Sequence, residues 1–135
     1  MKRWATLAVA ASVLLIAACG SESDDTKTSG TGPLSNEQAC AEARVVQADQ
    51  QRLTDDLKAG KADMGRMMKE METTADRLEA VVGRVPPGQT QDAIRQWAAT
   101  SKAQLDNPTD ENQDATYNAR DKVDDLCGIP RGSRL

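Results

Sequence analysis

Small and apolar side chains recur at alternating steps of three and four residues from residue 39 to residue 85 of this chain. Such spacing aligns side chains along one side of an α-helix. Phe is absent and runs of Val or Ile are few, so the usual material of β-strands is missing. We therefore predict an all-α fold with a core stripe formed by Ala39, Ala43, Val46, Leu53, Leu57, Met64, Met67, Met71, Leu78, Val81 and Val85. Gln50, Gly60 and Thr74 fill the remaining positions of the same spacing.

The stripe passes through residues 58–63 without slipping, which leaves two interpretations. Residues 36–85 form either one long helix or two helices joined by a tight turn at Gly60. We favour the turn, because Gly60 suits the position after a helix and Asp63 can cap the next helix. The prediction is an antiparallel up-down bundle of four helices, or a long helical hairpin if Gly60 does not break the first helix.

The first and third helices have clear starting signals. Ser35-Asn36-Glu37-Gln38 has the form of a capping box, with Leu34 and Ala39 placed as a hydrophobic staple. Pro86-Pro87-Gly88 then breaks the chain before a third helix at about residues 89–105. One side of this third helix carries Ile94, Trp97, Ala98 and Leu105.

Asn107-Pro108 ends the third helix, because a proline disfavours helical geometry in the residue before it. A fourth helix is expected from about Thr109 to Cys127, where Gly128 suits the position after a helix. Its apolar side would be formed by Ala115 or Thr116, Ala119, Val123 and Leu126.

The chain begins like an exported protein. Lys2 and Arg3 precede an apolar stretch at residues 5–18, which ends in small residues before Cys19. This is the anatomy of a signal peptide. A retained transmembrane helix is the alternative, but the stretch is shorter than the roughly 20 residues that a spanning helix needs.

Ile16-Ala17-Ala18-Cys19 resembles the lipobox of bacterial lipoproteins: an aliphatic residue, two small residues and a cysteine. The resemblance implies that Cys19 is diacylated on sulfur and that the leader is cut off before it. Residues 1–18 would then be the signal peptide, 19–34 the lipidated cysteine with a polar tether, 35–128 the bundle, and 129–135 a frayed tail. We expect localisation at the extracytoplasmic face of the cell membrane, or at the outer membrane in a Gram-negative host.

The other two cysteines provide a geometric test of the bundle. Cys40 falls in the first turn of the first predicted helix, and Cys127 falls in the last turn of the fourth. An up-down-up-down bundle brings these points to the same end. We predict a structural disulfide between them, since exported proteins meet an oxidising compartment. A redox pair is the alternative, but no CxxC spacing supports it.

Several chemistries are excluded or disfavoured. The chain has no histidine, which excludes Ser-His and Cys-His nucleophile pairs. Its formal net charge of −4 becomes −6 when the two leader cations are removed, and bases alternate with acids, so nucleic acid is not an expected partner. The acidic pairs Asp55-Asp56 and Asp124-Asp125 lack calcium-loop spacing and are interpreted as solvated helix faces. No cofactor, metal site, enzymatic activity or small-molecule substrate is predicted.

Met64, Met67, Met68 and Met71 are the most unusual local group. Thioethers suit Cu(I), but these positions also belong to the predicted core stripe, where methionine fills irregular gaps. We favour core packing and keep a Cu(I)-handling lipoprotein as the alternative function. Trp97 is expected to be the largest core side chain of the third helix, or an interaction hot spot if it is exposed.

The predicted bundle also resembles the small alanine-rich helical lipoproteins of high-GC Gram-positive bacteria, which end in a cysteine and a glycine as Cys127-Gly128 does here. Their roles are mostly unassigned. The expected function is therefore a small interaction module, anchored to the membrane through Cys19, with an envelope protein as its partner. An envelope enzyme is the least favoured alternative.

Overall fold

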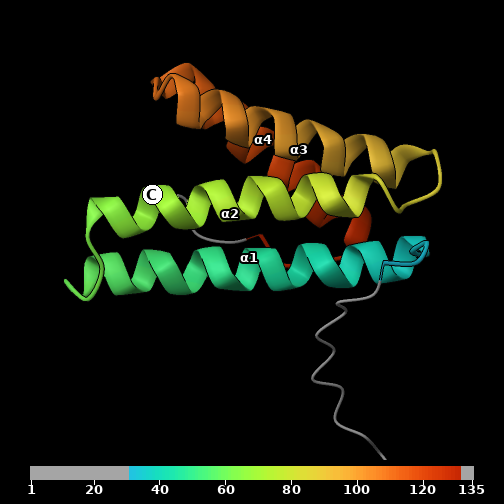
Figure 1. The fold of residues 1–135 in the computed structure, drawn as a ribbon, viewed down its shortest axis with the longest axis horizontal. Helices are drawn as coiled ribbons and strands as arrows, with labels where there is room; N and C mark the ends of the chain where they lie inside the picture. The colour runs from blue at the N-terminus through green and yellow to red at the C-terminus, as the bar shows by residue number, and fades with distance from the viewer. Residues whose placement is uncertain (1–30, 132–135) are drawn as a thin grey trace, which may run out of the picture.

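The computed structural model describes residues 31–131. They form four α-helices and no strand: α1 (Asn36–Lys58), α2 (Met64–Val82), α3 (Gln89–Asp106) and α4 (Asp110–Cys127). Helices that follow one another in the chain run in opposite directions (Figure 1). The predicted all-α up-down bundle is confirmed.

The chain breaks at Gly60, so the first half of the domain is two helices and not one. Gly60 has a φ of +69°, in the left-handed region, and its N–H donates to the Leu57 carbonyl at 3.0 Å. The Asp63 side chain then accepts a hydrogen bond from the Arg66 N–H at 2.8 Å and caps α2. The favoured interpretation of this segment is confirmed.

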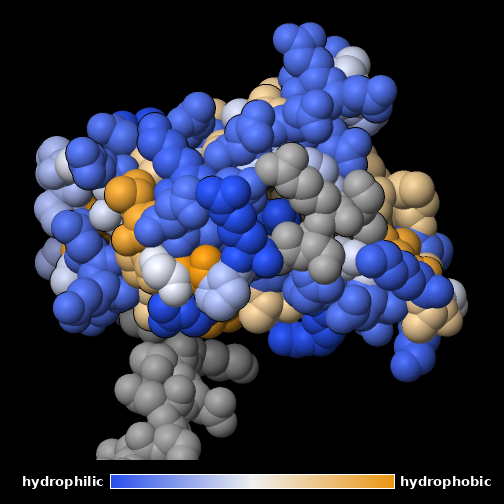
Figure 2. Space-filling model, turned by 180° about the vertical axis from the view of Figure 1, so that it is seen from behind, coloured by the Kyte–Doolittle hydropathy of each residue, from blue (hydrophilic) through white to orange (hydrophobic). Residues whose placement is uncertain are grey.

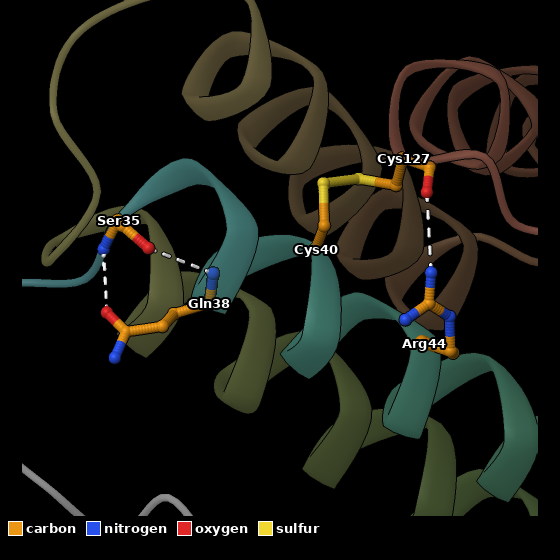
Figure 3. The surroundings of a disulfide bond; sticks show 5 residues. All are labelled: Ser35, Gln38, Cys40, Arg44 and Cys127. Atoms are coloured by element: carbon orange, nitrogen blue, oxygen red, sulfur yellow. Dashed lines mark hydrogen bonds between the residues drawn. A yellow bond between two sulfur atoms is a disulfide. The ribbon is translucent and has the colours of Figure 1, made fainter.

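The other helix boundaries follow the signals in the sequence. The Ser35 hydroxyl accepts from the Gln38 N–H at 3.2 Å, and the Gln38 side chain accepts from the Ser35 N–H at 2.9 Å, which completes the capping box (Figure 3). The Thr109 hydroxyl caps α4, and Gly128 ends it with a φ of +61°. These local polar contacts satisfy backbone groups that the helices leave without partners.

The predicted disulfide between Cys40 and Cys127 is present, with the two Cα atoms 5.3 Å apart. Figure 3 shows it joining the first turns of α1 to the end of α4, beside a hydrogen bond of 3.4 Å from the Arg44 guanidinium to the Cys127 carbonyl. The bond therefore closes one end of the bundle, which we call the disulfide end.

The apolar core lies toward the disulfide end. α3 packs against α1, α2 and α4, whereas α2 and α4 do not approach one another closely. Trp97 of α3 is fully buried, as expected for the largest core side chain. The apolar residues buried with it are Leu34, Ala39, Ala43, Val46, Leu78, Val81, Val85, Ala93, Ile94, Ala98, Ala119, Val123 and Ile129.

Two residues of the predicted apolar stripes are on the surface instead. Met64 is 64% exposed, and the residues beside it at positions 63–66 are exposed as well, so the first turn of α2 adds nothing to the core. Leu126 is 43% exposed, because Cys127 lies four residues after Val123 and takes the inward position. Within residues 31–131, no helix is both long and apolar enough to cross a membrane.

Candidate ligand-binding cavity

The residues singled out from the sequence end up in different places. Cys40 and Cys127 are bonded at the disulfide end. The lipobox, Ile16-Ala17-Ala18-Cys19, lies outside the described residues, so its role stays a prediction.

The four methionines of α2 do not gather into one site. Met67 and Met71 are half-buried and line a cavity inside the bundle. Met64 is on the surface, and Met68 is 37% exposed and borders a separate shallow hollow between α2 and α3. Only two of the four thioethers therefore face a common space. Among residues 31–131, no group of three or more acidic or cysteine side chains is arranged to hold a metal ion.

The cavity that Met67 and Met71 line has a volume of about 140 Å³ and is partly open to solvent. It lies in the half of the bundle opposite the disulfide end, where the joined ends of α3 and α4 rise away from α1 and α2 (Figure 1). All four helices contribute to its wall: Gln50, Leu53, Thr54, Leu57, Met67, Met71, Trp97, Ser101, Gln104, Gln113, Thr116, Tyr117 and Arg120.

The identity of the inward-facing residues explains why the cavity forms at this end. The disulfide end is filled by branched side chains such as Val46, Leu78 and Ile94. The opposite half has Thr54 and Thr116 at buried positions. These shorter, polar side chains do not fill the space between diverging helices.

Two polar groups in the cavity wall lack a hydrogen-bond partner. Trp97 is 0% exposed and Ser101 is 3% exposed, and neither the indole Nε1 nor the serine Oγ is hydrogen-bonded. The neighbouring threonines behave differently, since Thr54 donates to the Gln50 carbonyl at 3.0 Å and Thr116 donates to the Asn112 carbonyl at 2.9 Å. A buried donor without a partner costs about 1–3 kcal/mol, so each one calls for an explanation.

Arg120 is the only charged side chain among the described residues that line the wall. It is 6% exposed, and its guanidinium carbon lies 5.1 Å from the centre of the Tyr117 ring, a cation–π distance. Two carboxylates of the same helix face the guanidinium, with Asp121 Oδ1 at 3.7 Å and Asp124 Oδ2 at 4.0 Å. These two carboxylates offset the positive charge of Arg120, so the cavity is not a strongly cationic site.

The acidic pair Asp124-Asp125 was interpreted as a solvated helix face, and that is wrong for its first member. Asp124 is 0% exposed and accepts a hydrogen bond of 2.9 Å from the Gln47 side chain of α1. Burial raises the pKa of Asp124 to about 6, with smaller contributions in the same direction from the charges of Asp121 and Asp125. Asp125 does face solvent, where it pairs with Arg131 at 2.7 Å.

Two signals could have pointed to the cavity from the sequence. Thr116 is one of the residues expected on the apolar side of the fourth helix, and Gln50 occupies the stripe position between Val46 and Leu53. Each puts a polar group where the core of a fully packed bundle would be. The separation of the helices around them is a tertiary property that no local pattern contains.

Neither a known family, nor a curated protein, nor a solved structure matches this chain.

Proposed function

We propose that this protein is a bacterial lipoprotein whose helical bundle serves as a binding module at the extracytoplasmic face of the cell envelope. The observation that carries the proposal is the bond between Cys40 and Cys127. Stable disulfides are typical of exported proteins, because the bacterial cytosol keeps thiols reduced.

The bond also accounts for two of the three cysteines in the sequence. Cys19 is the third, and it follows Ile16-Ala17-Ala18 in the order of a lipobox. Cys19 would then carry the lipid anchor, whereas Cys40 and Cys127 form the disulfide. Two or more acyl chains suffice to hold a protein stably on a membrane. The small and polar residues 20–31 would then separate the bundle from the bilayer, since Leu34 is already buried in the core.

A binding role fits the surface and the interior of the bundle. The face in Figure 2 is hydrophilic for the most part, with small and separated hydrophobic patches, as suits a domain surrounded by water. The cavity wall offers amide, hydroxyl, thioether and indole groups. Such groups hold a ligand by packing and hydrogen bonds.

Phase partitioning with a non-ionic detergent tests the anchor. Protein expressed in a lipoprotein-processing host should enter the detergent phase, and its mass should show a lipid on Cys19 and no residues before it. The mass of the Cys19→Ser variant should show no lipid and an uncut leader at residues 1–18. A double variant, Cys40→Ser with Cys127→Ser, is the matched control and should partition like the unchanged protein. Lipoprotein assignment fails if Cys19→Ser protein is still lipidated and cut.

A further inference from the structure

The cavity has the size of a site for one small ring. Its volume is about 140 Å³, and an apolar cavity of about 150 Å³ is known to admit benzene. Leu53, Leu57, Met67 and Met71 contribute apolar surface, and Trp97 contributes an indole. Thioether sulfurs and indoles both make favourable contacts with aromatic rings. The apolar part of the wall therefore favours an aromatic ligand.

The polar part of the wall favours a ligand with an acceptor oxygen. Trp97 Nε1 can only donate a hydrogen bond, and Ser101 Oγ can donate one as well. Both atoms are without a partner, and both residues lie one helical turn apart on α3. A carbonyl oxygen placed against this turn would give one or both donors a partner.

A ligand reaches these donors only when the wall adjusts, because neither atom is in contact with solvent in this structure. Met67 and Met71 are suited to such an adjustment, since unbranched thioether side chains change rotamer easily. Both are half-buried at the same cavity. The thioethers thus form the adaptable side of the site, and α3 forms its fixed side.

The charges around the cavity favour an uncharged ligand. Among the described residues that line the wall there is no carboxylate to pair with a cationic ligand, and the Arg120 guanidinium would repel one. Arg120 already faces the carboxylates of Asp121 and Asp124, and these two negative charges would repel an anionic ligand. A neutral carbonyl avoids the cost of burying another charge.

We propose that the cavity binds one small, uncharged aromatic compound that carries a carbonyl group, with the ring between the thioethers and the indole and the oxygen at Trp97 Nε1 and Ser101 Oγ. This inference rests on the proposed function, because it names the ligand class of the binding module. It does not depend on the lipid anchor.

Two probes of nearly equal shape test the proposal. Acetophenone has a ring and a carbonyl, and ethylbenzene has the ring without an acceptor. The protein is the full chain with Cys19→Ser, labelled with ¹⁵N, so that no lipid can compete for the probes. Trp4→Phe in the same chain identifies the indole N–H resonance of Trp97 by elimination. Acetophenone should shift this resonance saturably and bind about tenfold more tightly than ethylbenzene.

Ser101→Ala is the informative variant, and Thr100→Ala is its matched control. Thr100 is the next residue of α3, is not part of the cavity wall, and has a hydroxyl that already donates to backbone carbonyls. Ser101→Ala should weaken acetophenone binding about threefold or more and leave ethylbenzene binding unchanged. Thr100→Ala should change neither affinity.

The ligand assignment is overturned if neither probe gives a saturable shift at Trp97, or if acetophenone and ethylbenzene bind equally well. It is also overturned if Thr100→Ala weakens acetophenone binding as much as Ser101→Ala does. Detergent partitioning decides the anchor independently. If Cys19 is not lipidated but acetophenone binds saturably, the lipoprotein assignment is wrong and the ligand site stands. If Cys19 is lipidated but acetophenone does not bind, the lipoprotein assignment stands and the ligand site is wrong.

Discussion

At the scale of single residues, the described structure buries polar groups in a way that a thin helical core makes costly. Asp124 is fully buried beside Gln47, and Trp97 and Ser101 carry donors without partners. A buried carboxyl is easier to accommodate when it is protonated, because the neutral form loses less hydration. The stability of the bundle should therefore respond to pH and to removal of single polar atoms.

The first prediction concerns Asp124. Burial raises its pKa to about 6 in the folded protein, against about 3.9 for an unfolded aspartate. The folded state thus binds the proton more tightly than the unfolded state does. The contribution of Asp124 to the free energy of unfolding therefore grows as the pH falls through 6 and is lost as the pH rises through 6. In urea unfolding experiments, Asp124 should increase the free energy of unfolding by about 1 kcal/mol when the pH is lowered from 8 to 5.

The gain is measured as the difference between the unchanged protein and Asp124→Asn over the same pH range. Asp114→Asn is a suitable control, because Asp114 is an exposed carboxylate on the same helix and is not among the groups that act on the pKa of Asp124. A pH profile that is unaffected by Asp124→Asn would contradict the raised pKa.

The second prediction concerns Ser101. Its hydroxyl has no partner, so Ser101→Ala removes an unsatisfied group and also favours the helix. The free energy of unfolding should rise by about 0.5–1 kcal/mol in urea titrations. Thr54→Val removes a hydroxyl that is bonded to the Gln50 carbonyl, and it should lower stability instead. Destabilisation by Ser101→Ala would show that its hydroxyl has a partner in solution.

At the scale of the elements, the turn between α1 and α2 decides whether the chain forms four helices or fewer. Gly60 adopts a left-handed φ of +69°, which residues with a Cβ rarely adopt. An added Cβ would meet no atom within 4 Å, so the cost of a substitution is that of the backbone conformation alone. Asp63 then begins α2 by capping it.

The third prediction follows from this turn. Gly60→Ala should lower the free energy of unfolding by about 1 kcal/mol, because alanine is strained at a left-handed φ. Gly83→Ala is the matched control, since Gly83 ends α2 with a φ of −66° and has room for a Cβ. That control should be neutral or slightly stabilising. A more stable Gly60→Ala protein with increased helical circular dichroism would indicate that α1 and α2 merge.

At the scale of the whole molecule, the bundle has two unequal halves. The disulfide end holds the apolar core and the bond between α1 and α4. The opposite half holds the cavity, where the helices diverge. The bond is thus placed at the better-packed end, and the other half is left with the space that a ligand or a side-chain movement requires.

The fourth prediction concerns the bond. The two cysteines are 87 residues apart, and closing a loop of this length stabilises a fold by about 4–5 kcal/mol in the chain-entropy model. The double variant Cys40→Ser with Cys127→Ser should lose most of this free energy and melt at a clearly lower temperature. Thermal unfolding by circular dichroism measures the loss. An unchanged melting temperature would mean that the core alone holds α1 against α4.

Local chemistry explains which features could be predicted from the sequence. The capping box at Ser35, the break at residues 86–88 and the glycine at Gly128 act through contacts with their own neighbours in the chain. The same holds for the turn at Gly60, which the stripe left open and the capping signals favoured. The disulfide followed because alternating helix directions bring the first and last turns together.

The sequence by itself therefore determined the all-α class, most helix ends and the pairing of Cys40 with Cys127, and it favoured four helices without excluding a single long first helix. Only the tertiary structure decided that Asp124 is buried, that Met64 is exposed, and that Trp97 and Ser101 line a cavity. The physical reason is that helix formation depends on residues three or four positions apart, whereas burial depends on how far two helices diverge. That divergence is set by all the side chains between them at once.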